Sequence, residues 1–220
     1  CGLVTVAGGK WTTYRKMAED AVDACIAGRA ELGARAAPCR TQGLLLVGCD
    51  REGAMCGGQY DRITAALRTD YGLDRDVARH LRYNYGVYAL QVVELARLEP
   101  ARFASPDGGF QRLHPQYAPL AAEVAFACRN EFAETAVDVL AHRTRLAFLN
   151  SAAALEVLPR VLAIMQKEKG WDDARVASEH ERAGAFLRAV MKPPGAPEDD
   201  AGAAAAAATS GSAERDAVAV

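Results

Sequence analysis

Apolar residues recur every three or four positions along most of this chain, which is the spacing of one face of an α-helix. In the first such stretch Tyr14, Met17, Ala21 and Cys25 fall on one side, and Thr12 or Thr13 is suited to cap the start of the helix. The predicted helices are residues 13–27, 60–71, 74–83, 87–98, 133–140, 155–165 and 172–190. We therefore expect a mainly α protein.

A few segments depart from the helical pattern. Residues 3–7 form a β-branched, apolar run that predicts a strand, and residues 44–47 predict a short extended piece. Apolar and small side chains alternate over residues 124–128, a pattern that fits a strand as well as a helix. Pro159 interrupts the apolar stripe of residues 155–165, so we expect a kink or a restarted helix at that point.

Composition divides the chain into four parts. Residues 1–27 hold the predicted strand, a glycine turn and the first helix, and residues 28–60 form a connector punctuated by glycines. Residues 61–190 carry the remaining helices. Residues 191–220 are rich in Ala, Gly and Pro and cannot bury enough apolar surface to offset the entropy of ordering, so we expect a disordered tail.

Net charge and cysteine spacing reduce the number of possible functions. The 220 residues have a formal net charge of -2, without the basic excess that a general nucleic-acid binder uses to displace counterions. Arg75, Arg79 and Arg82 beside Tyr83 resemble a helix-turn-helix, but a packed helical hairpin explains them equally well, and we expect no nucleic-acid partner. The six cysteines form no C-x-x-C pair, and no apolar run is long enough to cross a bilayer.

The most informative motif is the glycine turn at residues 8–13, which reads GGKWTT. A strand that turns through Gly8 and Gly9 into a helix presents free backbone N–H groups at the positive end of the helix dipole, where anions bind. The phosphate-loop pattern fails, because Thr5 stands where its first glycine is needed and Trp11 follows the lysine. The dinucleotide pattern fails as well, because no third glycine follows.

Two interpretations of the turn remain. The glycines would let the backbone approach a flat ring closely, and the helix end would stabilise a partial negative charge on that ring, as on a reduced flavin. The alternative is a plain turn with a surface lysine and capping threonines.

Several spaced motifs resemble one family, the FAD-dependent glycerol-3-phosphate dehydrogenases of mitochondrial type. The opening GLVTVAGGKWTTYR is similar to the late strand-turn-helix of their flavin domain. Four downstream segments resemble their helical C-terminal domain: HLRYNYGVYALQVVELA, AEVAFACRNE, TAVDVLAHRTRLAFLN and VLPRVLAIMQKEKGWDD. The similarity extends from residue 2 to about residue 190. It implies a helical C-terminal domain preceded by one residual strand-turn-helix of a Rossmann-type FAD domain.

The resemblance also implies an activity. The family oxidises sn-glycerol 3-phosphate to dihydroxyacetone phosphate and passes the electrons through FAD to quinone at a membrane surface. By position, Gly8, Gly9, Lys10, Thr12 and Thr13 would line the flavin, and Lys10 would be the catalytic residue. The implied location is the mitochondrial inner membrane in a eukaryote or the inner face of the cytoplasmic membrane in a bacterium, with a possible homodimer.

The remaining parts of the family pattern would precede residue 1, so we expect the isolated chain to bind FAD weakly or not at all. No calcium-binding loop follows residue 190, and the four histidines lack a second ligand at helical spacing, so we expect no metal site. Arg143 and Arg145 could contact a phosphate or the flavin domain, but ion pairs with Glu123, Glu131 or Asp138 are favoured. The alternative to a catalytic part is a non-catalytic helical structural or interaction module.

Overall fold

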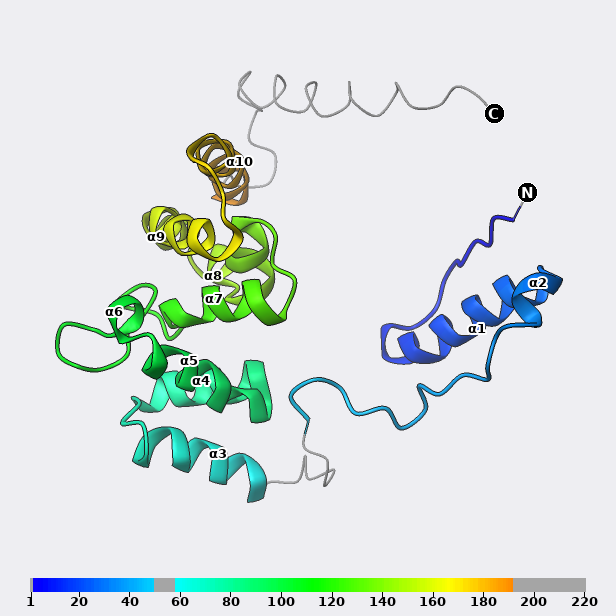
Figure 1. The fold of residues 1–220 in the computed structure, drawn as a ribbon, viewed down its shortest axis with the longest axis horizontal. Coiled ribbons are helices and arrows are strands. Elements are labelled where there is room, and N and C mark those ends of the chain that lie inside the picture. Colours follow the sequence, from blue (N-terminus) through cyan, green and yellow to red (C-terminus); the bar gives the residue numbers. More distant parts are fainter. Residues whose placement is uncertain (1, 50–57, 192–220) are drawn as a thin grey trace. The chain divides into compact units, whose positions relative to one another are not determined.

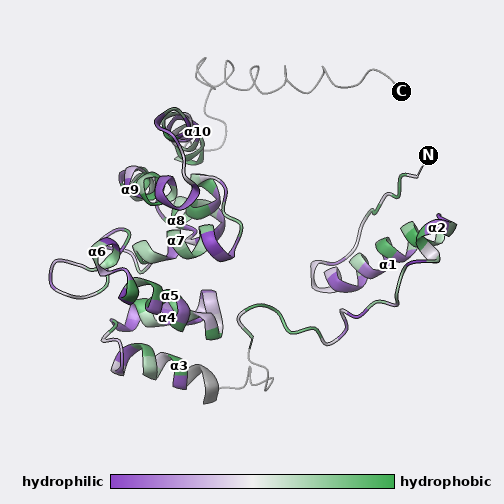
Figure 2. Ribbon diagram, in the orientation of Figure 1, coloured by the Kyte–Doolittle hydropathy of each residue, from purple (hydrophilic) through white to green (hydrophobic). Residues whose placement is uncertain are grey.

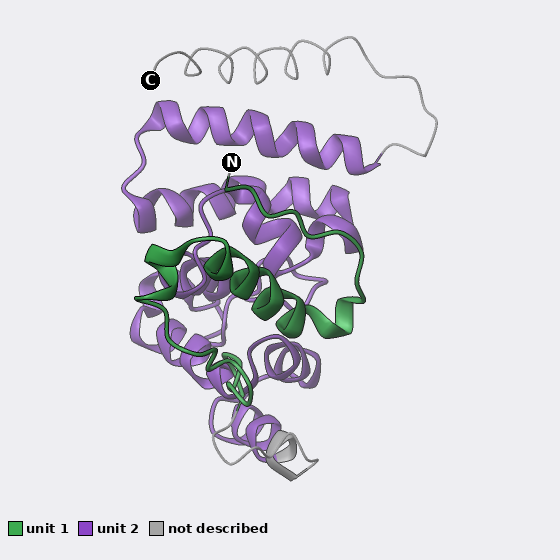
Figure 3. Ribbon diagram, turned by 90° about the vertical axis from the view of Figure 1, so that its right-hand side faces the viewer, with its two compact units in different colours: residues 1–53 green, residues 54–220 purple. Residues whose placement is uncertain are grey.

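The computed structural model describes residues 2–49 and 58–191 and divides the chain into two units, coloured separately in Figure 3. The N-terminal unit is Cys1–Gly53 and the C-terminal unit is Ala54–Val220. The predicted disordered tail lies outside the described residues apart from Met191, which belongs to the last helix.

The N-terminal unit consists of a short 3-10 helix, two α-helices and extended backbone. Its helices are η1 (Trp11–Thr13), α1 (Tyr14–Ala27) and α2 (Ala30–Gly33), so the first predicted helix is confirmed (Figure 1). Arg15 ties α1 to the segment after α2, because its guanidinium pairs with Glu19 and donates to Thr41 Oγ1 at 2.9 Å. None of the side chains of residues 2–49 is buried.

The strand predicted at residues 3–7 does not form, and the short extended piece predicted at residues 44–47 takes part in no strand. A strand is stabilised by hydrogen bonds to a neighbouring strand, and the described residues offer no pairing partner to either segment. The sequence pattern was therefore wrong about the strand in this chain, although it placed the following turn and helix correctly.

The C-terminal unit is a helical bundle. Its elements are α3 (Gly58–Thr69), α4 (Arg75–Tyr85), η2 (Gly86–Tyr88), α5 (Ala89–Leu98), α6 (Pro100–Phe103), α7 (Ala121–Asn130), η3 (Asp138–Arg143), α8 (Leu146–Leu149), α9 (Ser151–Lys169) and α10 (Asp173–Met191). Gly72 and Gly86 follow α3 and α4 with φ of 67° and 56°, as a helix stop requires. The mainly α fold is confirmed.

Helix α7 joins the two apolar clusters of this unit. Its Phe126 packs with α3, α4 and α5, whereas most of its alanines pack with α8, α9 and α10. Figure 2 shows α5 in green, the colour of hydrophobic residues, next to the more hydrophilic α4. Residues 121–127 of α7 are all buried, so its small and apolar residues are not confined to one face, and this is why its sequence also fitted a strand.

Two further helices refine the prediction. The predicted helix at residues 133–140 is helical only from residue 136 and continues as the π-helix η3, closed by Thr144 N–H donating to Val139 C=O at 2.9 Å. Helix α9 runs continuously through Pro159, so of the two alternatives that we expected, a kink or a restarted helix, the restarted helix does not occur. Pro159 is exposed, and there its ring meets solvent instead of the packed core. No helix in the described parts of the chain is long and apolar enough to span a membrane.

Candidate functional site

The glycine turn of the N-terminal unit has the backbone that its two glycines permit. Gly8 and Gly9 have φ of 78° and 108°, values that L side chains rarely adopt. A Cβ at Gly8 would meet no atom within 4 Å, so the turn is open on that side. A Cβ at Gly9 would lie 2.4 Å from Cε of Met17 on the first turns of α1.

Beyond the glycines the chain presents unused hydrogen-bond donors and one cation. The backbone N–H groups of Gly9, Lys10, Trp11 and Thr12 donate to no acceptor among residues 2–49 and 58–191, and the Lys10 ammonium pairs with no carboxylate there. Thr13 differs, because its hydroxyl and its N–H both donate to Lys10 C=O, at 2.8 and 2.9 Å. The structure thus brings Gly8, Gly9, Lys10 and Thr12 together as a donor-rich turn, and Thr13 holds that turn closed.

This donor set fits the edge of a flat, electron-rich ring. Bare backbone at Gly8 leaves room for close approach, the free N–H groups match carbonyl and ring-nitrogen acceptors, and an ammonium offsets negative charge. The exposed Trp11 and Tyr14 rings lie beside the turn with centroids 6.5 Å apart. Such a turn can donate hydrogen bonds to the polar edge of such a ring, but by itself it has no base to abstract a proton.

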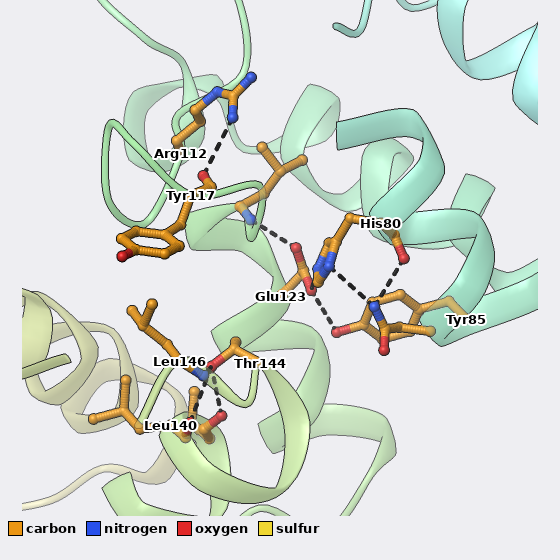
Figure 4. A network of polar contacts seen from close by, with 11 residues as sticks. His80, Tyr85, Arg112, Tyr117, Glu123, Leu140, Thr144 and Leu146 are labelled. Carbon is orange, nitrogen blue, oxygen red and sulfur yellow. Dashed lines mark hydrogen bonds and ion pairs between the residues drawn. The ribbon is translucent and has the colours of Figure 1, made fainter. Parts of the chain in front are cut away.

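A second polar arrangement lies inside the C-terminal unit, around Glu123 of α7 (Figure 4). The Glu123 side chain is 1% exposed and accepts three hydrogen bonds. Leu120 N–H donates to Oε1 at 2.6 Å, Tyr85 O–H donates to Oε2 at 2.8 Å, and His80 Nε2 lies 2.8 Å from Oε2. Since Tyr85 and His80 both belong to α4, this carboxylate fixes α4 on α7.

The network shifts the titration of its neighbours. Burial lowers the pKa of His80, but the charge and hydrogen bond of Glu123, with a smaller effect of Asp76, raise it more, so the net pKa lies above 6.5. Burial, and then the Glu123 charge, raise the pKa of Tyr85 well above 10. Burial also raises the pKa of Glu131, against the opposing charge of Arg143. The carboxylate is therefore a structural anchor that favours the protonated forms of His80 and Tyr85.

The structure gives partners to several of the arginines and histidines that were considered in the sequence analysis. Arg143 pairs with Glu131, its Nε lying 3.2 Å from Oε2, which confirms one of the three predicted ion pairs. Glu123 pairs with His80 instead of an arginine, and Asp138 lies 3.2 Å from His142, so those two predicted arginine pairs are wrong. Arg145 is exposed, has a φ of 58° and pairs with no described residue.

Sequence reasoning missed the role of Glu123 and Tyr85. The signal was present as a single acid inside the apolar run AAEVAFA, because a charged residue within a buried helix needs partners. It gave no indication which residues those partners were, since His80 and Tyr85 lie about forty positions earlier. Among the described residues, no group of three His, Cys, Asp or Glu side chains could hold a metal ion.

Known proteins are similar in sequence to most of this chain. It is 44% identical over 193 residues to a probable mitochondrial glycerol-3-phosphate dehydrogenase of Caenorhabditis elegans, covering 86% of this chain and 24% of that protein. It is 42% identical over 188 residues to mitochondrial glycerol-3-phosphate dehydrogenase of Homo sapiens, covering 84% of this chain and 24% of that protein. The chain thus spans about a quarter of the length of these relatives. No solved structure matches it.

A family model describes the greater part of the C-terminal unit. Residues 39–176 match the C-terminal domain of alpha-glycerophosphate oxidase, a range that takes in α3 to α9 and the start of α10. The matched range begins after the glycine turn, so the turn and the helical unit are independent observations. The chain belongs to the family of the C-terminal domain of alpha-glycerophosphate oxidase.

Proposed function

We propose that this chain is part of an FAD-dependent glycerol-3-phosphate dehydrogenase that oxidises sn-glycerol 3-phosphate to dihydroxyacetone phosphate. The observation that carries the proposal is the donor-rich turn of Gly8, Gly9 and Lys10 on a chain whose relatives bear that enzyme's name. The names of these relatives include the word mitochondrial, and we extend this location to the present chain, at the inner membrane. Quinone as electron acceptor and a homodimer belong to the same proposal.

In this proposal the chain contributes positioning and charge. The N–H groups after Gly9 would hold the polar edge of the flavin, Lys10 would place its ammonium against the ring, and Thr13 would keep the turn closed. FAD, when bound, supplies the acceptor for the hydride that leaves the substrate alcohol carbon. The ammonium of Lys10 would stabilise negative charge as it develops, without gaining or losing a proton.

The competing proposal is a non-catalytic helical module. The inward-facing network of Glu123 favours that role for the C-terminal unit, since the carboxylate is buried and its three hydrogen bonds all come from within the unit. The two proposals differ in what they expect of the turn. Only the enzymatic one requires Lys10 to affect turnover.

A chimera tests the difference. We would replace the matching quarter of the Caenorhabditis elegans relative with this chain and measure dye-linked oxidation of glycerol 3-phosphate. Lys10→Met should lower turnover about 100-fold, the size of effect that loss of one group stabilising transition-state charge produces. Lys16→Met is the matched control, because Lys16 lies on α1 and pairs with Glu19 and Asp20 on the helix surface. Equal turnover of both variants would favour the non-catalytic module.

A further inference from the structure

A hollow of about 700 Å³ lies beside α4. It is lined by Asp74, Arg75, Asp76, Arg79, His80 and Tyr83. Arg75, Arg79 and Tyr83 follow one another at intervals of four residues, so their side chains form one stripe along the outer face of the helix. The hollow involves no residue of the glycine turn.

Within the described part of the chain, no carboxylate neutralises the arginines of this hollow. Neither Arg75 nor Arg79 pairs with a carboxylate among the described residues, and Arg79 is held only by its position 5.5 Å above the Tyr83 ring. The two aspartates at the rim already bind Arg112, which donates to Asp74 at 2.8 Å and to Asp76 at 2.6 and 2.8 Å. These two aspartates thus pair with Arg112, and the guanidinium groups of Arg75 and Arg79 have no carboxylate partner among the described residues.

His80 gives the hollow a fixed inner wall. Its side chain is 14% exposed, and its Nε2 is fixed by Glu123 at 2.8 Å. Asn84 of the next turn contacts the other ring nitrogen at 3.0 Å and donates to His80 C=O at 2.8 Å, so the ring cannot rotate freely. An anion in the hollow would therefore meet the two arginines beside a fixed imidazole ring, whose two nitrogens are already engaged by Glu123 and Asn84.

We propose that this hollow binds a phosphate group, either as inorganic phosphate or as part of a small phosphate ester. Guanidinium forks bind phosphate oxygens with paired hydrogen bonds, and two forks one helical turn apart can hold one phosphate from two sides. The elevated pKa of His80, raised by Glu123 and Asp76 against the effect of burial, adds positive charge as the pH falls. This site is separate from the proposed flavin turn, and its existence does not depend on that proposal.

Nuclear magnetic resonance of the 220-residue chain tests the site directly. Inorganic phosphate is titrated in one arm and glycerol 3-phosphate in another, while the His80 imidazole and the α4 amides are observed. Saturable shifts confined to α4 are expected. Saturation by both compounds identifies phosphate itself as the ligand, whereas saturation by the ester alone identifies an ester site. The absence of saturable shifts in both arms would overturn the proposal.

Charge-matched variants separate a site from general attraction. Arg75→Gln with Arg79→Gln should weaken binding about tenfold or more, because two charge-assisted contacts are lost. Arg62→Gln with Arg68→Gln on α3 removes the same charge and should change binding less than about twofold. Circular dichroism checks that both pairs fold, which we expect because all four arginines are exposed. Equal weakening by both pairs would show an adventitious ion only and would refute the site.

Discussion

The hydrogen bond from Tyr85 to Glu123 gives the sharpest test of the C-terminal unit. Tyr85→Phe removes the hydroxyl that donates this hydrogen bond. The donor residue, Tyr85, is 6% exposed and the acceptor residue, Glu123, is 1% exposed. The ring keeps its packing, because it meets Phe126 edge to face with centroids 5.5 Å apart. A hydrogen bond to a buried charged group contributes about 1.5–3 kcal/mol. We therefore expect the free energy of unfolding to fall by about that amount.

Urea unfolding followed by tryptophan fluorescence measures this loss. A Trp11→Phe background leaves Trp171 of the C-terminal unit as the reporter, and an unchanged m-value would show that the unfolded state is unaltered. Tyr71→Phe is the control, because Tyr71 also donates to a carboxylate, Glu94, whose side chain is 35% exposed. That variant should lose less than about 1 kcal/mol. A loss for Tyr85→Phe no larger than for Tyr71→Phe would refute the assigned role of Glu123.

Three further predictions concern the C-terminal unit. The pKa of His80 lies above 6.5 in the folded state, so its contribution to stability is complete below about pH 6.5 and is lost as the pH rises through the folded pKa. His80→Gln should therefore flatten this part of the plot of unfolding free energy in urea against pH, and an unchanged plot would contradict the assignment. Burial raises the pKa of Cys128 to about 11, so iodoacetamide at pH 8 should alkylate it at least about 100-fold more slowly than the exposed Cys25. Mass spectrometry of peptides measures the two rates, and equal rates would be inconsistent with this burial. Pro159→Ala should raise the unfolding free energy by about 1–3 kcal/mol in the same urea assay, because an interior proline removes a hydrogen bond from α9. A decrease would mean that the proline stabilises the helix.

The sequence predicted helices where an apolar stripe faces one core. The predicted helix at residues 74–83 is α4, whose apolar side holds Val77 and Leu81 while its other side is charged. The pattern was ambiguous at α7, because residues 121–127 are all buried and the contrast between two faces disappears there. It was wrong at residues 3–7, because strand formation depends on a partner strand that is absent from the described residues.

The candidate site was predictable in the same uneven way. The glycine turn could be located from local chemistry, since Gly8 and Gly9 adopt the positive φ that only glycine adopts readily. The Glu123 network could not, because its members come from helices distant in sequence and are joined only by packing. Asp138 is a different case: it was predicted to pair with an arginine but caps the start of its own helix by accepting from Thr135 N–H at 2.9 Å, and this partner lies only three positions away in the sequence.

The most direct test of the central claim is anaerobic reduction of bound flavin by glycerol 3-phosphate in the chimera that carries this chain. Loss of flavin absorbance reports the first half of the reaction alone, without the electron acceptor. We predict rapid bleaching with Lys10 present and bleaching slower by about 100-fold in Lys10→Met at equal flavin content. Equal bleaching rates in the two proteins would contradict the proposal that this turn faces the flavin.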